Sequence, residues 1–141
     1  MENCNIIIAG VGGQGIILAS KVIAQCAFVE GFDVKENELH GMAQREGSVI
    51  SHVRFGKEVY SPLISRQQAD FIIGMEELEG LRYIHYLKPG GRVIVSKRIK
   101  KPTTVDLNKT PYPDNIPQQL KDMGFQVDLV DAVEIAKNVQ K

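Results

Sequence analysis

Apolar residues recur along this chain in short runs that polar or glycine-rich stretches separate. Residues 5–9, with an apolar run at 6–9, show no alternation, which is typical of a central strand covered on both faces. Residues 16–29 show helical spacing, and residues 32–35 alternate like a second strand, so the chain opens as a strand, a turn, a helix and a strand. The helix is expected to bury Ile16, Ala19, Val22, Ile23, Cys26 and Ala27, and to expose Ser20, Lys21 and Gln25.

The middle of the chain predicts a mixed sheet. Residues 48–55 and 58–64 both look like strands, and Gly56 and Lys57 between them suit a hairpin turn. Such a pair is antiparallel, whereas the strand–helix alternation elsewhere favours parallel pairing. The elements expected next are a buried strand at 71–74, a helix at 76–87 and a strand at 92–96.

The last third begins with a break and ends with regular elements. Residues 102–117 contain four prolines and are expected to form an irregular loop. The elements expected after it are a helix at 118–123, a strand at 126–130 and a terminal helix from Ala132. The whole chain, 1–141, therefore predicts a single three-layer α/β domain, with a Rossmann-like, mostly parallel mixed sheet and a glycine-rich loop after the first strand. Ligands of such sheets bind beyond the carboxyl ends of the strands.

Composition removes several classes of partner and cofactor. Lys+Arg and Asp+Glu number 17 each, so net charge indicates neither nucleic acid nor a membrane surface. The chain shows no secretory signal, and its first apolar run is too short to cross a bilayer, which predicts a cytoplasmic protein. Cys4 and Cys26 are expected to be buried and reduced; two thiols cannot supply the four that an iron–sulfur cluster usually needs, and no metal site is expected.

A glycine loop follows the first predicted strand. Gly10, Gly12 and Gly15 satisfy the pattern G-x-G-x-x-G between a strand and a helix, where helix N–H groups can meet an anion. The same pattern also suits a tight packing turn without a ligand. The acidic residue that would indicate a dinucleotide has several candidates, namely Glu30, Asp33, Glu36 and Glu38. The loop alone therefore leaves the identity of the anion open.

A polar, glycine-bearing segment at residues 38–48 looks like a binding loop. Together with the glycine loop, it resembles the gamma subunit or gamma domain of the pyruvate and ketoisovalerate (2-oxoacid):ferredoxin oxidoreductases, most closely the small subunit of the indolepyruvate group. The further matches are Ser51-His52-Val53-Arg54-Phe55-Gly56, Tyr60-Ser61-Pro62, Ala69-Asp70 and Gly90-Gly91. Members of this family usually continue into a C-terminal helical portion that this sequence does not include.

The resemblance implies one part of a larger enzyme. The family oxidatively decarboxylates a 2-oxo acid on thiamine diphosphate with Mg²⁺, passes electrons through [4Fe–4S] clusters to ferredoxin, and releases an acyl-CoA. The Gly-Asp-Gly and Asn-Asn signatures of a thiamine site do not occur here. A large partner subunit is therefore expected to carry thiamine diphosphate, Mg²⁺ and the clusters, while this chain, inactive alone, closes the active site and helps to bind CoA.

Specific residues follow from the resemblance. The backbone of Gly10, Gly12, Gly13 and Gly15, with the Gln14 side chain, is expected to meet a phosphate-bearing ligand, CoA being the choice. His40 is a candidate for proton transfer, and Arg45 and Glu46 are candidates for the subunit interface near the active site. His52 and Arg54 are expected to share a face of one strand, and His85 to lie on a helix surface. Two alternatives stay open: a stand-alone NAD(P)-binding oxidoreductase and a non-catalytic assembly subunit.

Overall fold

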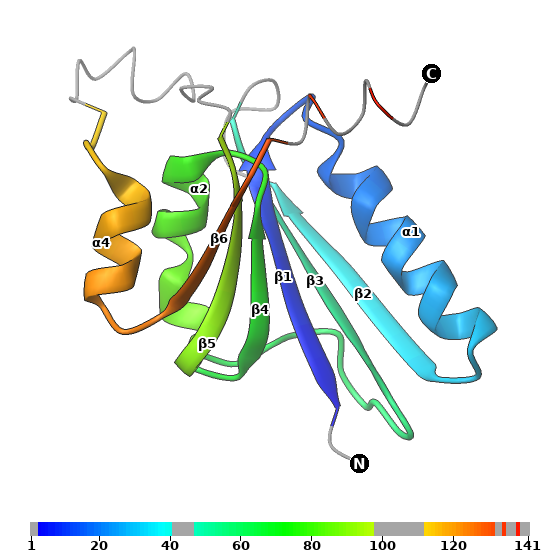
Figure 1. The fold of residues 1–141 in the computed structure, drawn as a ribbon. Coiled ribbons are helices and arrows are strands. Elements are labelled where there is room, and N and C mark those ends of the chain that lie inside the picture. Colours follow the sequence, from blue (N-terminus) through cyan, green and yellow to red (C-terminus); the bar gives the residue numbers. More distant parts are fainter. Residues whose placement is uncertain (1–2, 41–46, 98–111, 132–133, 135–137, 139–141) are drawn as a thin grey trace.

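The computed structural model describes residues 3–40, 47–97 and 112–131, together with 134 and 138. One mixed sheet of six strands organises this part of the chain, in the order β2-β3-β1-β4-β5-β6 (Figure 1). The strands are β1 (Cys4–Val11), β2 (Asp33–His40), β3 (Ser48–Gly56), β4 (Ala69–Gly74), β5 (Leu87–Ser96) and β6 (Gln126–Val130). Pairing is antiparallel between β2 and β3 and between β3 and β1, and parallel from β1 through β4 and β5 to β6.

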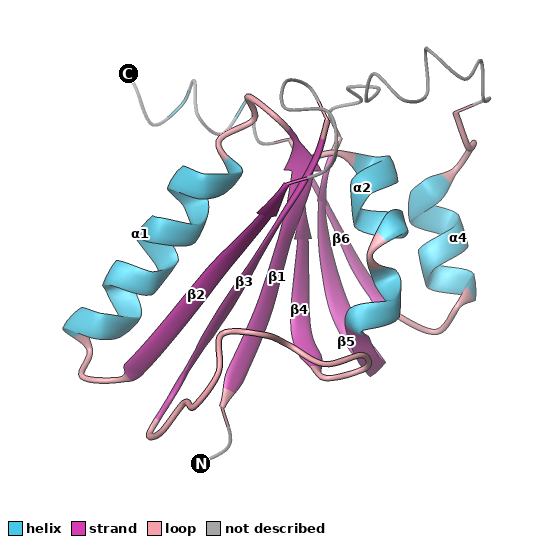
Figure 2. Cartoon of the chain, turned by 180° about the vertical axis from the view of Figure 1, so that it is seen from behind, coloured by secondary structure: helices cyan, strands magenta, loops and turns pink. Residues whose placement is uncertain are grey.

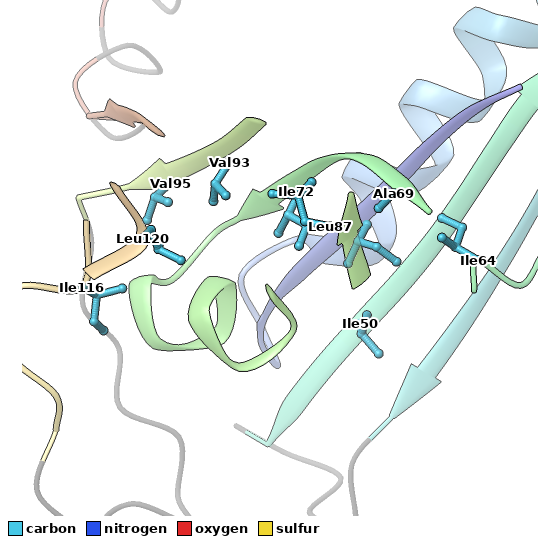
Figure 3. Close-up of a cluster of buried hydrophobic side chains, with 10 residues drawn as sticks. Ile50, Ile64, Ala69, Ile72, Leu87, Val93, Val95, Ile116 and Leu120 are labelled. Atoms are coloured by element: carbon cyan, nitrogen blue, oxygen red, sulfur yellow. The ribbon is translucent and has the colours of Figure 1, made fainter. Parts of the chain in front are cut away.

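Helices cover both faces of the sheet (Figures 1 and 2). On one face, α1 (Ile16–Val29) packs over β1, β2 and β3. On the other face lie α2 (Glu77–Arg82), the short 3₁₀ helix η1 (Ile84–Tyr86) and α4 (Ile116–Asp122). Two buried clusters hold the layers together, and Figure 3 shows the larger of them, between the sheet and α4. The predicted three-layer α/β architecture is therefore confirmed.

Several predicted elements are confirmed at or near their expected bounds. The helix at 16–29 and the strand at 126–130 match α1 and β6, while the short helix at 118–123 is α4, two residues earlier than expected at its start. The predicted helix at 76–87 is shorter: α2 ends at Arg82, and η1 completes the turn into β5, which begins at Leu87. The terminal helix expected from Ala132 and most of the proline-rich loop lie outside the described residues.

The predicted hairpin at 48–64 is wrong. β3 pairs with β2 on one side and with β1 on the other, and residues 57–68 form no strand. This connection instead crosses the sheet face from β3 to β4 (Figure 2). His52 and Arg54 hold it: the Ile64 N–H donates to His52 Nδ1 at 2.9 Å, and Arg54 Nη1 donates to the Ser61 carbonyl at 2.9 Å. The expectation that His52 and Arg54 share a face is confirmed.

The predicted faces of α1 are partly wrong. Ser20, expected on the wet face, is buried and donates to Glu36 at 2.8 Å while accepting from Ser51 at 2.7 Å. Val22 and Cys26, expected inside, are exposed, whereas Cys4 is half-buried. Apolar residues line both faces of this helix, so periodicity could not show which face the sheet covers. Hydrogen bonds of the buried Ser20 hydroxyl, to Glu36 of β2 and from Ser51 of β3, orient it instead.

Burial of His52 predicts a loss of stability in acid. Desolvation holds the pKa of His52 below its ordinary value of about 6.5, and protonation of Nδ1 would break the bond from the Ile64 N–H. The unfolded chain therefore binds a proton first as the pH falls through about 6.5, and the free energy of unfolding decreases towards acid. We expect His52→Gln to flatten this pH dependence in urea unfolding between about pH 7 and 5.

The matched control is His85→Gln, because His85 is exposed on η1, as the sequence predicted. That variant should keep the wild-type pH dependence. If the free energy of unfolding of the wild type and of His52→Gln changed equally with pH, the buried imidazole would have no role in acid stability.

Candidate functional site

The sheet has a topological switch point between β1 and β4. These parallel neighbours send the chain to opposite faces, because β1 leads into α1 and β4 leads into α2. Figure 1 shows both helices beginning at the end of the sheet where β1 and β4 end. The Met75 N–H donates to the Ala9 carbonyl at 2.8 Å and closes the base of this region. In open α/β sheets, such a switch point is the usual place for a ligand.

The glycine loop lies at this switch point, and its glycines have different structural roles. Gly10 is the last but one residue of β1, and a Cβ there would lie 2.4 Å from Ile16 Cδ1 and 3.1 Å from Met75 Cβ. Gly10 therefore permits close packing of the strand against the start of α1. Gly13 and Gly15 have φ of 90° and 83°, in the left-handed region that glycine adopts without strain.

The loop satisfies several of its own donors. The Gly12 N–H donates to the Gly47 carbonyl at 2.9 Å, and the Gln14 N–H donates to the Val11 carbonyl at 3.1 Å. The Gln14 side chain folds back, so that its Oε1 accepts from the Val11 N–H at 2.8 Å. Residues 10–12 thus take part in packing and hydrogen bonds within the protein, and the exposed part of the loop is at Gly13 and Gly15.

The start of α1 is suited to an anion. Gly15 is its N-cap residue, no side-chain hydrogen bond caps it within the described structure, and its first turn contains no acidic residue. A Cβ built on Gly15 would meet no described atom within 4 Å, so none of the described residues covers this side of the loop. Helix N-termini attract negative charge through their N–H groups and the helix dipole.

Next to the loop, a set of hydroxyl–carboxylate hydrogen bonds that centres on the buried Glu79 ties the start of β3 to α2. Ser48 Oγ lies 2.5 Å from Glu79 Oε2 and 2.6 Å from Tyr83 Oη, and Arg82 Nε donates to Glu79 Oε1 at 3.2 Å. Glu79 is fully buried. Burial raises the pKa of its carboxyl, while the hydrogen bond from Ser48 and the charge of Arg82 oppose that rise.

A second buried carboxylate caps α2. Glu76 accepts from the Glu79 N–H at 3.0 Å through Oε1 and from the Tyr112 hydroxyl through Oε2. The same hydroxyl accepts from the Leu78 N–H at 3.0 Å. Burial, together with the hydrogen bond to Glu76, raises the pKa of Tyr112 well above its ordinary value, so the phenol stays protonated as a donor.

Sequence reasoning missed this carboxylate cluster. The available signal was the run Glu76-Glu77-Leu78-Glu79 directly after the buried strand at 71–74, since acidic residues are favoured in the first turn of a helix. Nothing in the pattern showed that two of these side chains are fully buried. Ser48 was the last residue of the predicted binding segment, but its partners on α2 lie 31 and 35 positions away.

The structure tests the other candidate residues only in part. The backbone of His40 pairs with Val49, which brings the C-terminal end of β2 close to Gly47 and Ser48 at the start of β3. Arg45 and Glu46 lie outside the described residues, as does the side chain of His40. Within the described chain, no group of three or more His, Cys, Asp and Glu could hold a metal ion. None of the described helices is long and apolar enough to span a membrane.

Comparisons with known proteins point in one direction. A family model described as pyruvate ferredoxin/flavodoxin oxidoreductase matches residues 5–141. Indolepyruvate oxidoreductase subunit IorB of Thermococcus kodakarensis is 45% identical over 113 residues, which are 80% of this chain and 56% of that protein. IorB of Archaeoglobus fulgidus is 42% identical over 135 residues, covering 94% of this chain and 67% of that protein. The chain therefore spans little more than half of the first of these relatives.

Solved structures share the fold. Pyruvate oxidoreductase subunit PORC of Thermotoga maritima superposes with a TM-score of 0.67 at 21% identity, covering 100% of this chain and 69% of that one. The 2-oxoglutarate:ferredoxin oxidoreductase of Magnetococcus marinus gives a TM-score of 0.66 at 20% identity, and the match takes up 22% of its chain. At these identities the likeness concerns architecture alone.

Proposed function

This chain belongs to the pyruvate ferredoxin/flavodoxin oxidoreductase family, and from that membership we propose that it is a non-autonomous subunit of a 2-oxoacid:ferredoxin oxidoreductase. In this proposal, residues 1–141 form one gamma-type domain that closes an active site supplied by a larger partner and helps to bind CoA. The relatives named indolepyruvate oxidoreductase subunit IorB favour indolepyruvate as the 2-oxo acid. A complex of this kind would work in the cytoplasm and deliver electrons to ferredoxin.

One observation carries the CoA assignment: the open N-terminus of α1, at Gly13 and Gly15, lies at the switch point of the sheet. CoA is rich in phosphate, and phosphates are the anions that glycine-lined helix N-termini bind. The Magnetococcus marinus enzyme, which shares this fold, has coenzyme A bound in its solved structure. We assign phosphate contact to the exposed side of the loop, and the packing of the loop to Gly10, Gly12 and Gln14.

Thiamine diphosphate, Mg²⁺ and [4Fe–4S] clusters fit poorly on this chain. Cys4 is half-buried on β1 and Cys26 is exposed on α1, and two cysteines do not complete a cluster. The described residues also hold no carboxylate group arranged for a metal, since Glu76 and Glu79 are engaged by hydroxyl and N–H donors. We therefore place these groups on the partner and leave this chain the tasks of binding and enclosure. His40, Arg45 and Glu46 remain candidates for its active-site edge.

Strand order disfavours the alternative of a stand-alone NAD(P)-binding oxidoreductase. In dinucleotide-binding folds, β2 lies beside β1, and an acidic residue near the end of β2 meets the ribose. Here β3 lies between them, which moves β2 about 10 Å from β1. Glu36, the acidic residue in the middle of β2, is moreover bonded to Ser20.

The proposal is tested by recovering the chain from its native cells under anaerobic conditions and identifying what accompanies it by mass spectrometry. We expect a large subunit with Gly-Asp-Gly and cysteine-rich cluster motifs, and viologen reduction by the recovered complex with indolepyruvate and CoA. Recovery of the chain alone, or only as a self-assembled oligomer, would refute the subunit assignment.

A further inference from the structure

Ser48 joins the two sides of the switch point. Its backbone lies opposite Val11, the residue that leads from β1 into the glycine loop. Its side chain reaches in the other direction, to Glu79 on α2, which follows β4. One residue thus connects β3 to the helix on the far side of β1.

The neighbouring residue contacts the glycine loop directly. The Gly47 carbonyl accepts from the Gly12 N–H at 2.9 Å, and Gly47 itself is buried. The position of this carbonyl depends on the conformation of residues 47 and 48, where β3 begins. The position of the turn at Gly12 therefore depends on how Ser48 is held.

The anchoring bond of Ser48 is strong because its acceptor, Glu79, is a buried carboxylate. Glu79 is fully buried, and a hydroxyl that donates to a carboxylate in such surroundings makes a shorter and stronger bond than two neutral groups do. Tyr83 donates to the Ser48 oxygen in the same chain, and Arg82 occupies the second oxygen of Glu79. These contacts with Glu79 and Tyr83 together hold the Ser48 side chain in one position.

We propose that the Ser48–Glu79 hydrogen bond positions the glycine loop for its ligand, so that Ser48 and Glu79 are positioning residues for the phosphate site. The ligand part of this inference rests on the proposed function. The dependence of the Gly12–Gly47 contact on the Ser48 hydroxyl is independent of the proposed function.

The test compares Ser48→Ala with Ser48→Thr in the intact complex. Loss of the hydroxyl should accelerate hydrogen exchange of the Gly12 amide by roughly tenfold, since one hydrogen bond to a charged group is worth that order of magnitude. The KM for CoA should rise by a similar factor, with a smaller change in kcat. Ser48→Thr keeps a hydroxyl and should restore both values.

Tyr112→Phe is the matched control for stability. It removes a donor from Glu76, the other buried carboxylate of this helix, which bonds to the Tyr112 hydroxyl and the Glu79 N–H. It should lower the unfolding midpoint and leave Gly12 exchange unchanged. Unchanged Gly12 exchange in Ser48→Ala would overturn the inference. Faster exchange with an unchanged KM for CoA would uphold the positioning of the loop and count against the loop as the CoA site.

Discussion

Replacing Leu120 with alanine is expected to lower the free energy of unfolding by about 2–5 kcal/mol. Leu120 and Ile116 are fully buried and are the two residues through which α4 enters the larger core cluster. Figure 3 shows the Leu120 side chain beside Val95 of the sheet, with Ile116 on the outer side of Leu120. Truncation of Leu120 leaves a cavity, and because α4 has only seven residues, few of its other side chains can move to fill it. Urea unfolding followed by circular dichroism measures the change.

Met123→Ala, at the end of the same helix, is the control. Met123 is 54% exposed, so its truncation should change the free energy of unfolding by no more than about 0.5 kcal/mol. A loss below about 1 kcal/mol for Leu120→Ala would show that α4 is not an anchor of the core. Leu120→Met keeps the volume of the side chain and should cost less than about 1.5 kcal/mol.

Placing an acidic residue at Gly15 is expected to raise the KM for CoA in the assembled enzyme by roughly 5-fold to 1,000-fold. A carboxylate about 4 Å from a phosphate costs about 1–4 kcal/mol at effective dielectric constants between 80 and 20. The space is available, because a Cβ at Gly15 meets no described atom within 4 Å. The left-handed backbone at Gly15 strains any side chain, but Asp tolerates it better than most residues and favours a helix N-terminus. Gly15→Asn carries the same backbone strain, so a comparison of the two variants cancels it.

Two variants separate charge from shape. Gly15→Asn has nearly the same shape without the charge and should raise the KM for CoA much less. Gly31 has φ of 93°, equally open surroundings and a place just beyond the other end of α1, so Gly31→Asp should leave the KM unchanged. If Gly15→Asp assembles normally and keeps the wild-type KM, CoA does not bind at this loop.

The sequence by itself determined the elements whose signals are local. An unbroken apolar run predicts β1, and helical spacing after a glycine break predicts α1. The glycine loop was equally visible, because the geometry of a strand–turn–helix depends on residues close together in the chain. These signals sufficed for the three-layer class and for the family resemblance.

Only the tertiary structure decided how distant segments meet. The apolar content of residues 58–64 is real, since Val59 and Ile64 are buried. A hydrogen bond from the Ile64 N–H to His52 and another from Arg54 to the Ser61 carbonyl nevertheless hold these residues as an irregular crossing and not as a strand. The insertion of β3 between β1 and β2 likewise depends on pairings that no local pattern encodes.

The dependence on distant partners also explains why the sequence did not show the buried contacts of the candidate site. The polar pattern could show that Ser20, Ser48 and Glu79 are hydrophilic, but each is held by partners from other elements, 16 to 35 positions away in the chain. Burial of a polar group is favourable only where a partner satisfies it, and that partner is known only once the sheet has formed. The sequence thus determined the loop and the helix that follows it, whereas the fold decided which side of the loop is open and what holds it in place.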